Sequence, residues 1–598
     1  MEASPVAHYV SNGSSTRAAR ERLRGWELAS VLAALMLTLL LAALDQTIVS
    51  TALPRILSQL HGEDRYTWVV TSYLLTSTTM IPIVGKLSDQ FGRKWFVVIG
   101  VIIFLIGSAL SGASQSMNQL IIYRGLQGIG AGMVLAMVFT LVGDIFTPVE
   151  RAKWQGLFTS MFALASVVGP TLGGYLTDNG PLLGSFVTDA TRWRWVFYVN
   201  LPVGVIALVF LLRFLPANIS ARSTNFTGWA AVRRVDFAGS LTAAGATTCL
   251  LLGLTFGGQT YPWNSAPVIG TLAGAVVLYA AFAYIEARVA VEPLLPLDLF
   301  RNQIFTAGAL LSLTVGAALL AVSIYLPLFI QGVMGLSATS SGAAVTPLTL
   351  TLAAASVTCG LIISRLGRYQ VISIIGAVIM AVGIFLLTRL NSSSNLLEVS
   401  RDMVVVGLGL GMVQPVLTLA VQNAIPRTRL GVGTGAVTYL RSLGSTLGLA
   451  VIGTVVNGAF SGALPAHLPA AARQLPPSVL ALATSQGTLV APGLKQQLTA
   501  GVVQAAVARI PPGPDHTTLA AQVTAQVTTL MNQIFEATRQ SLAVGIQQAF
   551  WVAFGIAIAI ALITVFLKDV PLRGSIPTPQ PVGAEPVIPP AVVGAKAE

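Results

Sequence analysis

The chain has 598 residues, of which 54% are hydrophobic and 9% are charged, with a net charge of +12 and a mean hydropathy of +0.76. Because an ordinary soluble domain carries about a quarter charged residues, this composition excludes a water-facing globular surface and predicts an all-α protein that crosses a membrane many times. The basic residues are scattered between apolar runs, so the net charge does not predict a nucleic-acid partner.

Apolar runs of about 20 residues recur along the chain, and each is long enough to span a bilayer as a helix. The sequence predicts fourteen spans, near residues 27–53, 68–84, 95–113, 118–144, 154–176, 194–214, 236–257, 266–286, 304–330, 342–364, 370–389, 402–422, 432–457 and 545–567. An even number of spans places both termini on one side. Arginines and lysines concentrate in the loops on the same side of the membrane as the N-terminus. Because basic loops favour the cytoplasmic side, we predict a multi-pass protein of the bacterial inner (cell) membrane with both termini cytoplasmic.

The first predicted span contains Asp45, the sole acid placed deep within a span. Charges inside a bilayer are costly and are therefore candidates for function. Burial favours the neutral form of a carboxyl group, so a buried acid can exchange its proton for a cation or for a conformational change. Two interpretations stay open for Asp45: proton coupling or contact with a cationic substrate, and a purely structural cap or pair.

A short basic loop is predicted between the second and third spans, at residues 85–94, with three cations and one acid. A weaker copy at residues 360–369 keeps the two glycines and the final arginine but has Ser364 where the first copy has Asp89. Repeated basic loops on one membrane face are what a transporter with two similar halves needs.

Arg124 begins a glycine-rich stretch of the fourth span, in which Gly128 and Gly132 permit another helix to approach closely. Structural and coupling roles are equally open for this arginine and for Arg441 in the thirteenth span. Three acids lie at predicted cytoplasmic span ends beside arginines and are predicted to form gate or anchoring ion pairs: Asp144, Asp236 and Glu286.

Span five contains a run of small residues around a proline, formed by Gly169, Pro170, Gly173 and Gly174. The proline removes an intrahelical hydrogen bond and the glycines permit tight helix crossing.

Residues 169–173 align with residues 444–448 at the same separation as the two loops, which predicts two parallel six-span halves with a central substrate path. The expected organisation is a cytoplasmic tail at 1–25, a first half at 26–215, a linker with an inserted two-helix hairpin at 216–290, a second half at 291–570 and a disordered cytoplasmic tail at 571–598.

A long, nearly uncharged segment at residues 458–544 precedes the last span. Apolar residues at helical spacing in 494–506 and 519–534, separated by a proline-rich stretch at 511–514, predict a helical hairpin outside the membrane that runs straight into the last span. Two interpretations stay open: a spacer that rests on the bilayer surface, or a wall that guides an amphipathic substrate.

The sequence lacks the motifs of an enzyme or of an ATP-driven pump, because it has no phosphate-binding loop, zinc-protease motif or nucleophile elbow. Cys249 and Cys359 fall inside predicted spans, and all four histidines fall outside them, so no disulfide, metal centre or other cofactor is expected. An ion gradient is therefore the expected energy source.

Several of these motifs together resemble the major facilitator superfamily, and in particular its fourteen-span drug:proton antiporter branch. The loop at 85–94 resembles the loop motif of that family, Arg124 with its glycines resembles the span-four motif, and residues 169–174 resemble the span-five motif of exporters. Residues 44–54 and 193–202 resemble signatures of the fourteen-span branch. The likeness covers residues 26–457 and the last span.

The resemblance implies alternating access of two rocking halves, in which proton entry drives export of small hydrophobic or amphipathic substrates. It also implies coupling roles for Asp45 and Arg124, and a cytoplasmic gate network formed by Gly85, Asp89, Gly92, Arg93 and Asp144. The expected partners are these substrates, protons and membrane lipids, and the expected state is a monomer. Because the segment at 458–544 is long and deep acids that could bind a cationic drug are scarce, export of a lipid or glycolipid is the second interpretation. A non-transporting receptor or scaffold is the third.

Overall fold

The computed structural model describes residues 25–60, 66–184, 187–216, 235–258, 261–336, 338–391, 394–490, 492–511 and 516–569. Within these ranges the chain is almost entirely helical, and 14 helices are long and apolar enough to cross a membrane. The predicted all-α polytopic fold and the predicted number of spans are confirmed. The predicted tail at 571–598, and all of the predicted tail at 1–25 except Gly25, lie outside the described residues.

Twelve of the spans form two groups of six with matching helix pairings. The first group consists of α2 (Trp26–Leu60), α3 (Tyr66–Phe91), α4 (Arg93–Ala113), α5 (Met117–Ile145), α6 (Pro148–Asn179) and a sixth span built from η1 (Asp189–Arg194), α7 (Trp195–Tyr198) and α8 (Asn200–Phe214). The second consists of α12 (Gln303–Leu328) with the π-helical turn η3 (Phe329–Val333), α13 (Ala338–Leu366), α14 (Gln370–Leu387), α15 (Leu396–Ala424), α16 (Leu430–His467) and α20 (His516–Val565). In the first group α2 packs on α6, and α5 packs on α3 and α4; in the second α12 packs on α16, and α15 packs on α13 and α14.

The two remaining spans, α10 (Phe237–Phe256) and α11 (Ala266–Arg288), form the inserted hairpin and pack on each other. A chain of three hydroxyl groups ties this hairpin to the second half. Tyr439 on α16 shares hydrogen bonds with Thr247 on α10 at 2.7 Å and with Tyr279 on α11 at 2.6 Å.

The two basic loops are tighter than the sequence predicts, because helix α3 continues to Phe91 and helix α13 continues to Leu366. Only Gly92 separates α3 from α4, with a φ of 97°, and Gly367 occupies the equivalent turn with a φ of 69°. Since this left-handed backbone region favours glycine, both turns depend on the glycines that the two sequence copies share. We call this end of the bundle, which is predicted to be cytoplasmic, the Gly92 end.

The halves meet closely at the Gly92 end. Helix α6 packs on α13, and α3 packs on α16. A Cβ atom added to Gly85 on α3 would lie 2.6 Å from the Gly431 carbonyl oxygen at the start of α16. Gly360 on α13 abuts the Ala152 carbonyl oxygen near the start of α6 in the corresponding way, so the two repeat glycines seal this end symmetrically.

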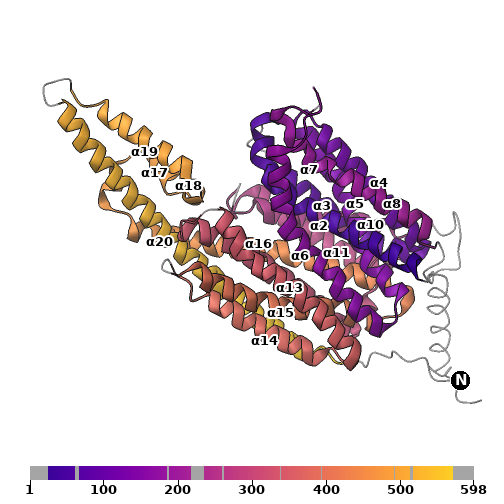
Figure 1. Ribbon diagram of the computed structural model, residues 1–598. Coiled ribbons are helices and arrows are strands. Elements are labelled where there is room, and N and C mark those ends of the chain that lie inside the picture. The colour runs from indigo at the N-terminus through magenta and orange to yellow at the C-terminus, as the bar shows by residue number, and fades with distance from the viewer. Residues whose placement is uncertain are drawn as a thin grey trace, which may run out of the picture.

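Beyond the opposite end, the chain between the last two spans forms a separate arm (Figure 1). It contains the end of α16, η5 (Ala470–Gln474), α17 (Pro477–Ala483), α18 (Gln486–Val490), α19 (Pro492–Val507) and the start of α20. The arm has its own apolar cluster, centred on Met531, Ile534 and Phe535. Helix α20 continues from the arm into the last span, as predicted. The rest of the arm differs from the predicted helical hairpin, because prolines at 469, 476 and 477 divide its first part into several short helices.

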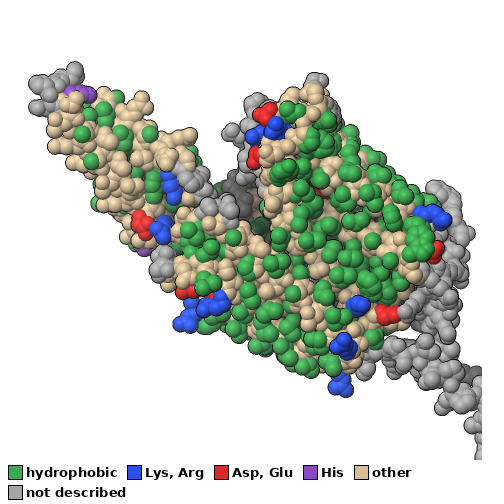
Figure 2. Space-filling model, in the orientation of Figure 1, with side chains coloured by type: hydrophobic (Ala, Val, Ile, Leu, Met, Phe, Trp, Pro, Cys, Tyr) green, Lys and Arg blue, Asp and Glu red, His purple; other side chains and the backbone are tan. Residues whose placement is uncertain are grey.

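The surface of the bundle has the polarity of a membrane protein. Figure 2 shows hydrophobic side chains over its flank and most charged side chains near its two ends. The inserted helix α11 illustrates this, because its exposed side chains include Val276, Val277 and Tyr284.

Candidate functional site

Asp45 on α2 and Arg124 on α5 form an ion pair in the interior of the first half. The two side chains are 0% and 1% exposed, respectively. The arginine also donates to the Val69 carbonyl oxygen at 3.3 Å, and its guanidinium carbon lies 4.3 Å from the centre of the Tyr73 ring. The structure therefore brings together two charged residues that the sequence singled out separately.

Two amides complete the surroundings of the Asp45 carboxylate. Gln127 Nε2 donates to Asp45 Oδ1 at 2.9 Å, and Asn200 Nδ2 donates to the same oxygen at 3.2 Å. Gln127 Oε1 in turn accepts from Arg124 at 2.8 Å, and Asn200 also donates to Ser108 Oγ at 3.0 Å. Sequence reasoning did not identify Gln127 or Asn200 as site residues, although Asn200 lies in a quoted signature and Gln127 lies one helical turn after Arg124.

A second buried charge cluster occupies the Gly92 end. Arg93 at the start of α4 pairs with Asp89 at 2.5 Å and with Asp144 at the end of α5 at 2.6 Å, and it donates to Ser88 Oγ at 2.8 Å. The Arg93 side chain is 0% exposed, so the two carboxylates compensate a charge that water does not reach. The structure thus joins three of the residues predicted for the gate network, and Gly85 and Gly92 shape the backbone around them.

Asp89 also reaches across to the second half. Its two carboxylate oxygens accept hydrogen bonds from the backbone N–H groups of Gly431 and Val432, each at 2.9 Å. These amides are at the N-terminus of α16, which has no side-chain cap of its own. A carboxylate at a helix N-terminus satisfies unpaired N–H donors and interacts favourably with the helix dipole.

The second loop copy lacks this device. Ser364, which replaces the acid, donates to the Leu361 carbonyl oxygen within its own helix. Helix α6, which corresponds to α16, carries its own capping box from Thr147 and Glu150. The two loops therefore share a backbone turn, whereas the interhalf carboxylate belongs to the first copy.

The small residues predicted as an exporter motif lie on α6 and face different surroundings. Gly169 is buried against Thr47 on α2, two residues after Asp45, and Gly173 is also buried. Pro170 is exposed within the helix, and a Cβ atom added to Gly174 would meet nothing within 4 Å. Close helix contact thus involves one face of the motif only.

Arg441 on α16 does not join either charge cluster. Its guanidinium carbon lies 5.5 Å from the centre of the Phe162 ring on α6, across the boundary between the halves. No acid in the described part of the chain forms an ion pair with it.

Among the residues that the structure describes, two of the three acids predicted to form ion pairs have no arginine or lysine partner, so the predicted pairs are not found there. Asp236 caps helix α10 by accepting from the Gly239 N–H at 2.7 Å. Glu286 accepts from the backbone N–H groups of Leu294 and Leu295 at 2.9 and 3.1 Å. Both carboxylates meet unpaired backbone donors at helix ends and turns, which compete with arginines for a carboxylate. Asp144 alone of the three pairs as predicted.

The described residues contain no group of three or more His, Cys, Asp or Glu side chains that could hold a metal ion. The Asp45 and Arg93 clusters consist of ion pairs and hydrogen bonds, and the making and breaking of these contacts is the chemistry that they can support.

Comparison with known proteins places this geometry in a family context. The model of the Major Facilitator Superfamily matches residues 35–449. Over 424 residues the chain is 40% identical to the multidrug transporter protein MdtP of Bacillus subtilis, covering 71% of this chain and 74% of that protein. It is 35% identical to multidrug resistance protein 3 of the same organism, covering 73% of this chain and 80% of the relative.

Solved structures share the fold at low identity. The proton:xylose symporter XylE matches with a TM-score of 0.52 and 13% identity, over 90% of this chain and 96% of the symporter. The human organic anion transporter MFSD10 matches with a TM-score of 0.50 and 15% identity, over 89% of this chain and all of that chain (100%).

Proposed function

The chain belongs to the major facilitator superfamily, so it is a membrane transporter rather than an enzyme, and we propose that it is a proton-coupled exporter of small hydrophobic or amphipathic molecules. The names of its relatives, a multidrug transporter and a multidrug resistance protein, support small-molecule export. The proposed setting is the inner membrane of a bacterium, with both termini cytoplasmic and the chain acting as a monomer.

The observation that carries the proton-coupled part of the proposal is the fully buried pair of Asp45 and Arg124. The carboxylate and the guanidinium compensate each other in an interior that water does not reach. A proton that arrives at Asp45 removes the negative charge and leaves Arg124 with the neutral acceptors of Gln127 and Val69. Proton binding therefore changes the forces on α3, which supplies the Val69 carbonyl and the Tyr73 ring.

Helix α3 connects this pair to the gate network. Tyr73 in the first part of α3 contacts Arg124, and Asp89 in its last turn holds the N-terminus of α16. Because α3 contacts both clusters, a shift of this helix at one cluster can displace it at the other. We infer that proton binding at Asp45 biases the two halves between closed and open states at the Gly92 end.

Export of a lipid is the second candidate function, and the folded arm is the observation that favours it. The arm continues the last two-span pair beyond the bundle and carries exposed apolar side chains such as Leu482 and Leu519. Such a surface suits an amphipathic molecule that leaves the bilayer. A receptor or scaffold has no need for two internally compensated charge clusters linked by one helix.

Transport in everted membrane vesicles tests the proposal. The Asp45→Asn variant is expected to lose substrate accumulation driven by a pH gradient but to keep energy-independent exchange of labelled for unlabelled substrate. The matched control is Asp189→Asn, which changes an acid with a 77% exposed side chain and leaves transport intact. Gradient-driven transport at the wild-type rate in Asp45→Asn would exclude proton coupling through this residue.

A further inference from the structure

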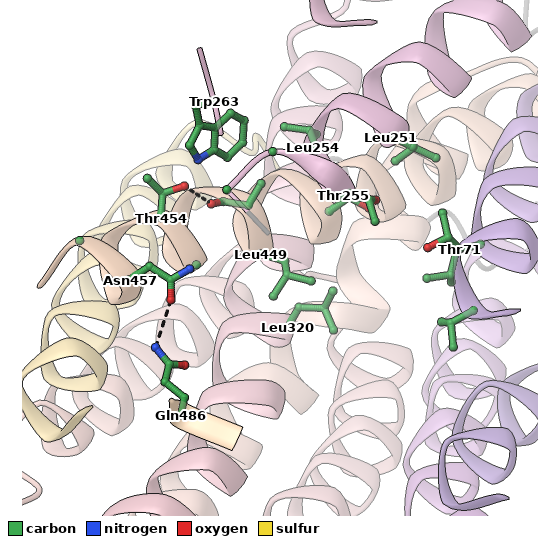
Figure 3. Close-up of a pocket in the computed structure, with 18 of the residues that line it drawn as sticks. Thr71, Leu251, Leu254, Thr255, Trp263, Leu320, Leu449, Thr454, Asn457 and Gln486 are labelled. Carbon is green, nitrogen blue, oxygen red and sulfur yellow. Dashed lines mark hydrogen bonds between the residues drawn. The ribbon is translucent and has the colours of Figure 1, made fainter. Parts of the chain in front are cut away.

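A cavity of about 800 Å³ lies at the arm end of the bundle, where four parts of the chain meet. Thr71 and Leu74 of α3 line one side, and Leu254 of α10 lines the side formed by the inserted hairpin. Leu449 of α16 lines the side of the second half, and Gln486 of α18 brings the arm to the rim. Figure 3 shows Thr71, Leu254, Leu449 and Gln486 around a shared space, with Trp263 at its border. Its volume suits a drug-sized molecule.

The lining is apolar with a small polar edge. Leu254, Leu320 and Leu449 face the interior of the cavity, and none of the described lining residues is charged. A charged ligand would lose its hydration here without gaining an ionic partner, whereas an uncharged ligand would not incur this cost. The walls thus select for an uncharged molecule with an apolar body.

The polar edge has a hydrogen-bonding pattern that fits a ligand. Gln486 Nε2 donates to Asn457 Oδ1 at 3.1 Å, which joins the arm to α16. The pair keeps the Asn457 amide NH₂ group as a donor and the Gln486 carbonyl as an acceptor at the rim. A hydroxyl group, or an amide group that has an N–H, at one end of a ligand can bind both.

The inserted hairpin contributes a fixed wall. The Trp263 ring packs on the backbone of Gly257 and Gly258, where added Cβ atoms would lie 2.6 Å from ring atoms. Gly258 has a φ of 74°, so the turn that holds the indole requires glycine. The hydroxyl chain through Tyr439 fixes the same hairpin to α16.

The cavity and the buried ion pair lie on either side of α3. Val70, Thr71 and Leu74 face the cavity, while the Val69 carbonyl and the Tyr73 ring contact Arg124. A ligand in the cavity therefore packs on the same helical turns that hold the proposed coupling residue.

We propose that this cavity is a binding site for an uncharged amphipathic molecule, and that the arm and the inserted hairpin are parts of the site. The proposal rests on the proposed export function for its substrate class. It assigns to both insertions a role in ligand recognition, so the arm is a wall of the site and not a spacer.

Equilibrium binding of the neutral fluorescent amphipath N-phenyl-1-naphthylamine to the full chain in nanodiscs tests the site. Leu449→Trp fills the cavity and is expected to weaken binding about tenfold or more, because overpacking excludes the ligand. Val451→Trp is the matched control, since Val451 lies on the same helix, is 53% exposed and does not line the cavity. Equal affinity of the two variants would overturn the proposal.

The rim is tested separately. Gln486→Ala is expected to weaken binding several-fold through loss of one hydrogen-bonding group, about a factor of 3 to 10. The control Gln504→Ala changes an exposed glutamine of α19 that does not line the cavity and leaves the affinity unchanged. Wild-type affinity in Gln486→Ala would exclude the arm from the site.

A charge comparison and a transport control complete the test. Tetraphenylphosphonium, a cation with an apolar body, is expected not to compete with the neutral probe for the cavity. If the cation does compete, and Leu449→Trp abolishes this competition, the cavity binds a charged molecule and the assignment to uncharged ligands is contradicted. Asp189→Asn, the exposed acid that serves as the control in the transport assay, is expected to bind the neutral probe with wild-type affinity. Failure of the cavity variants to affect binding thus refutes the site, whereas continued gradient-driven export by Asp45→Asn refutes the coupling proposal alone.

Discussion

The Asp89 carboxylate on α3 accepts a hydrogen bond from the backbone N–H of Gly431 at the start of α16, 2.9 Å away, although the two residues belong to different six-helix halves. Gly431 tolerates this approach because it has no side chain: a Cβ atom there would lie 2.7 Å from the same carboxylate and 2.6 Å from Arg93. The contact is thus a charged helix cap that one half supplies to the other at the Gly92 end.

Replacing Asp89 by Asn is expected to favour opening at the Gly92 end. The variant loses the negative charge opposite Arg93 and at the helix N-terminus, interactions worth about 1–3 kcal/mol, so the open population rises by roughly 5- to 150-fold. Modification rates of a cysteine placed at the interhalf contact report the change. Ser364→Ala in the second loop copy is the control and leaves the rate unchanged, since Ser364 bonds only within its own helix. Equal rates in both variants would contradict a gate role for Asp89.

The glycines of the span-five motif are expected to differ in their tolerance of a methyl group. In Gly169→Ala the new Cβ atom would lie 2.8 Å from the Thr47 Cβ atom, which overpacks the α2–α6 contact at a cost of about 1–3 kcal/mol. In Gly174→Ala the methyl group meets open space and the effect on stability is near zero. Thermal unfolding in detergent measures both, and a Gly174→Ala variant as unstable as Gly169→Ala would show that the motif acts through something other than helix packing.

The sequence predicted the parts of this molecule that depend on composition and repetition. Apolar runs revealed the fourteen spans, because their length is set by bilayer thickness. The glycines shared by the two loops predicted a repeat, and the structure places Gly92 and Gly367 in the same left-handed turn. The two copies differ at Asp89 and Ser364, and the structure gives these residues different partners: Asp89 bonds to the second half, and Ser364 bonds within its own helix.

Partners that depend on how distant helices pack were not predictable. Asn200 and Gln127 are uncharged, so nothing in a single sequence separates them from other amides until α5 and α8 are seen to converge on Asp45. Asp236 and Glu286 were assigned to arginines nearby in sequence, but backbone N–H groups at helix ends are their partners. The contact of α18 with the rim of the cavity likewise depends on how the arm folds back.

Replacing Arg124 by Lys keeps the charge but is expected to impair both stability and gradient-driven transport. A lysine cannot bind Asp45, Gln127 and the Val69 carbonyl together or stack on the Tyr73 ring as the planar guanidinium does. The expected loss of stability is about 1–3 kcal/mol. The control is Arg441→Lys, because no described acid pairs with Arg441, and its unfolding temperature is expected to match that of the wild type. Transport at the wild-type rate in Arg124→Lys would mean that charge alone, without the guanidinium geometry, suffices.

Replacing Met531 by Asp is expected to unfold the arm while the membrane bundle stays intact. Met531 is 0% exposed in the apolar cluster of the arm, and a buried carboxylate without a partner costs about 3 kcal/mol or more, which a small cluster cannot offset. Limited trypsin digestion then cuts at Arg473, Lys495 and Arg509 faster than in the wild type. Leu519→Asp, at a position that is 44% exposed on the same helix, is the control and is expected to digest at the wild-type rate. Export of a neutral drug and of a fluorescent lipid is measured on the same samples. Because the arm forms part of the cavity rim, export of the drug is expected to fall. Undiminished export of both compounds from a chain with an unfolded arm would show that the arm is a spacer.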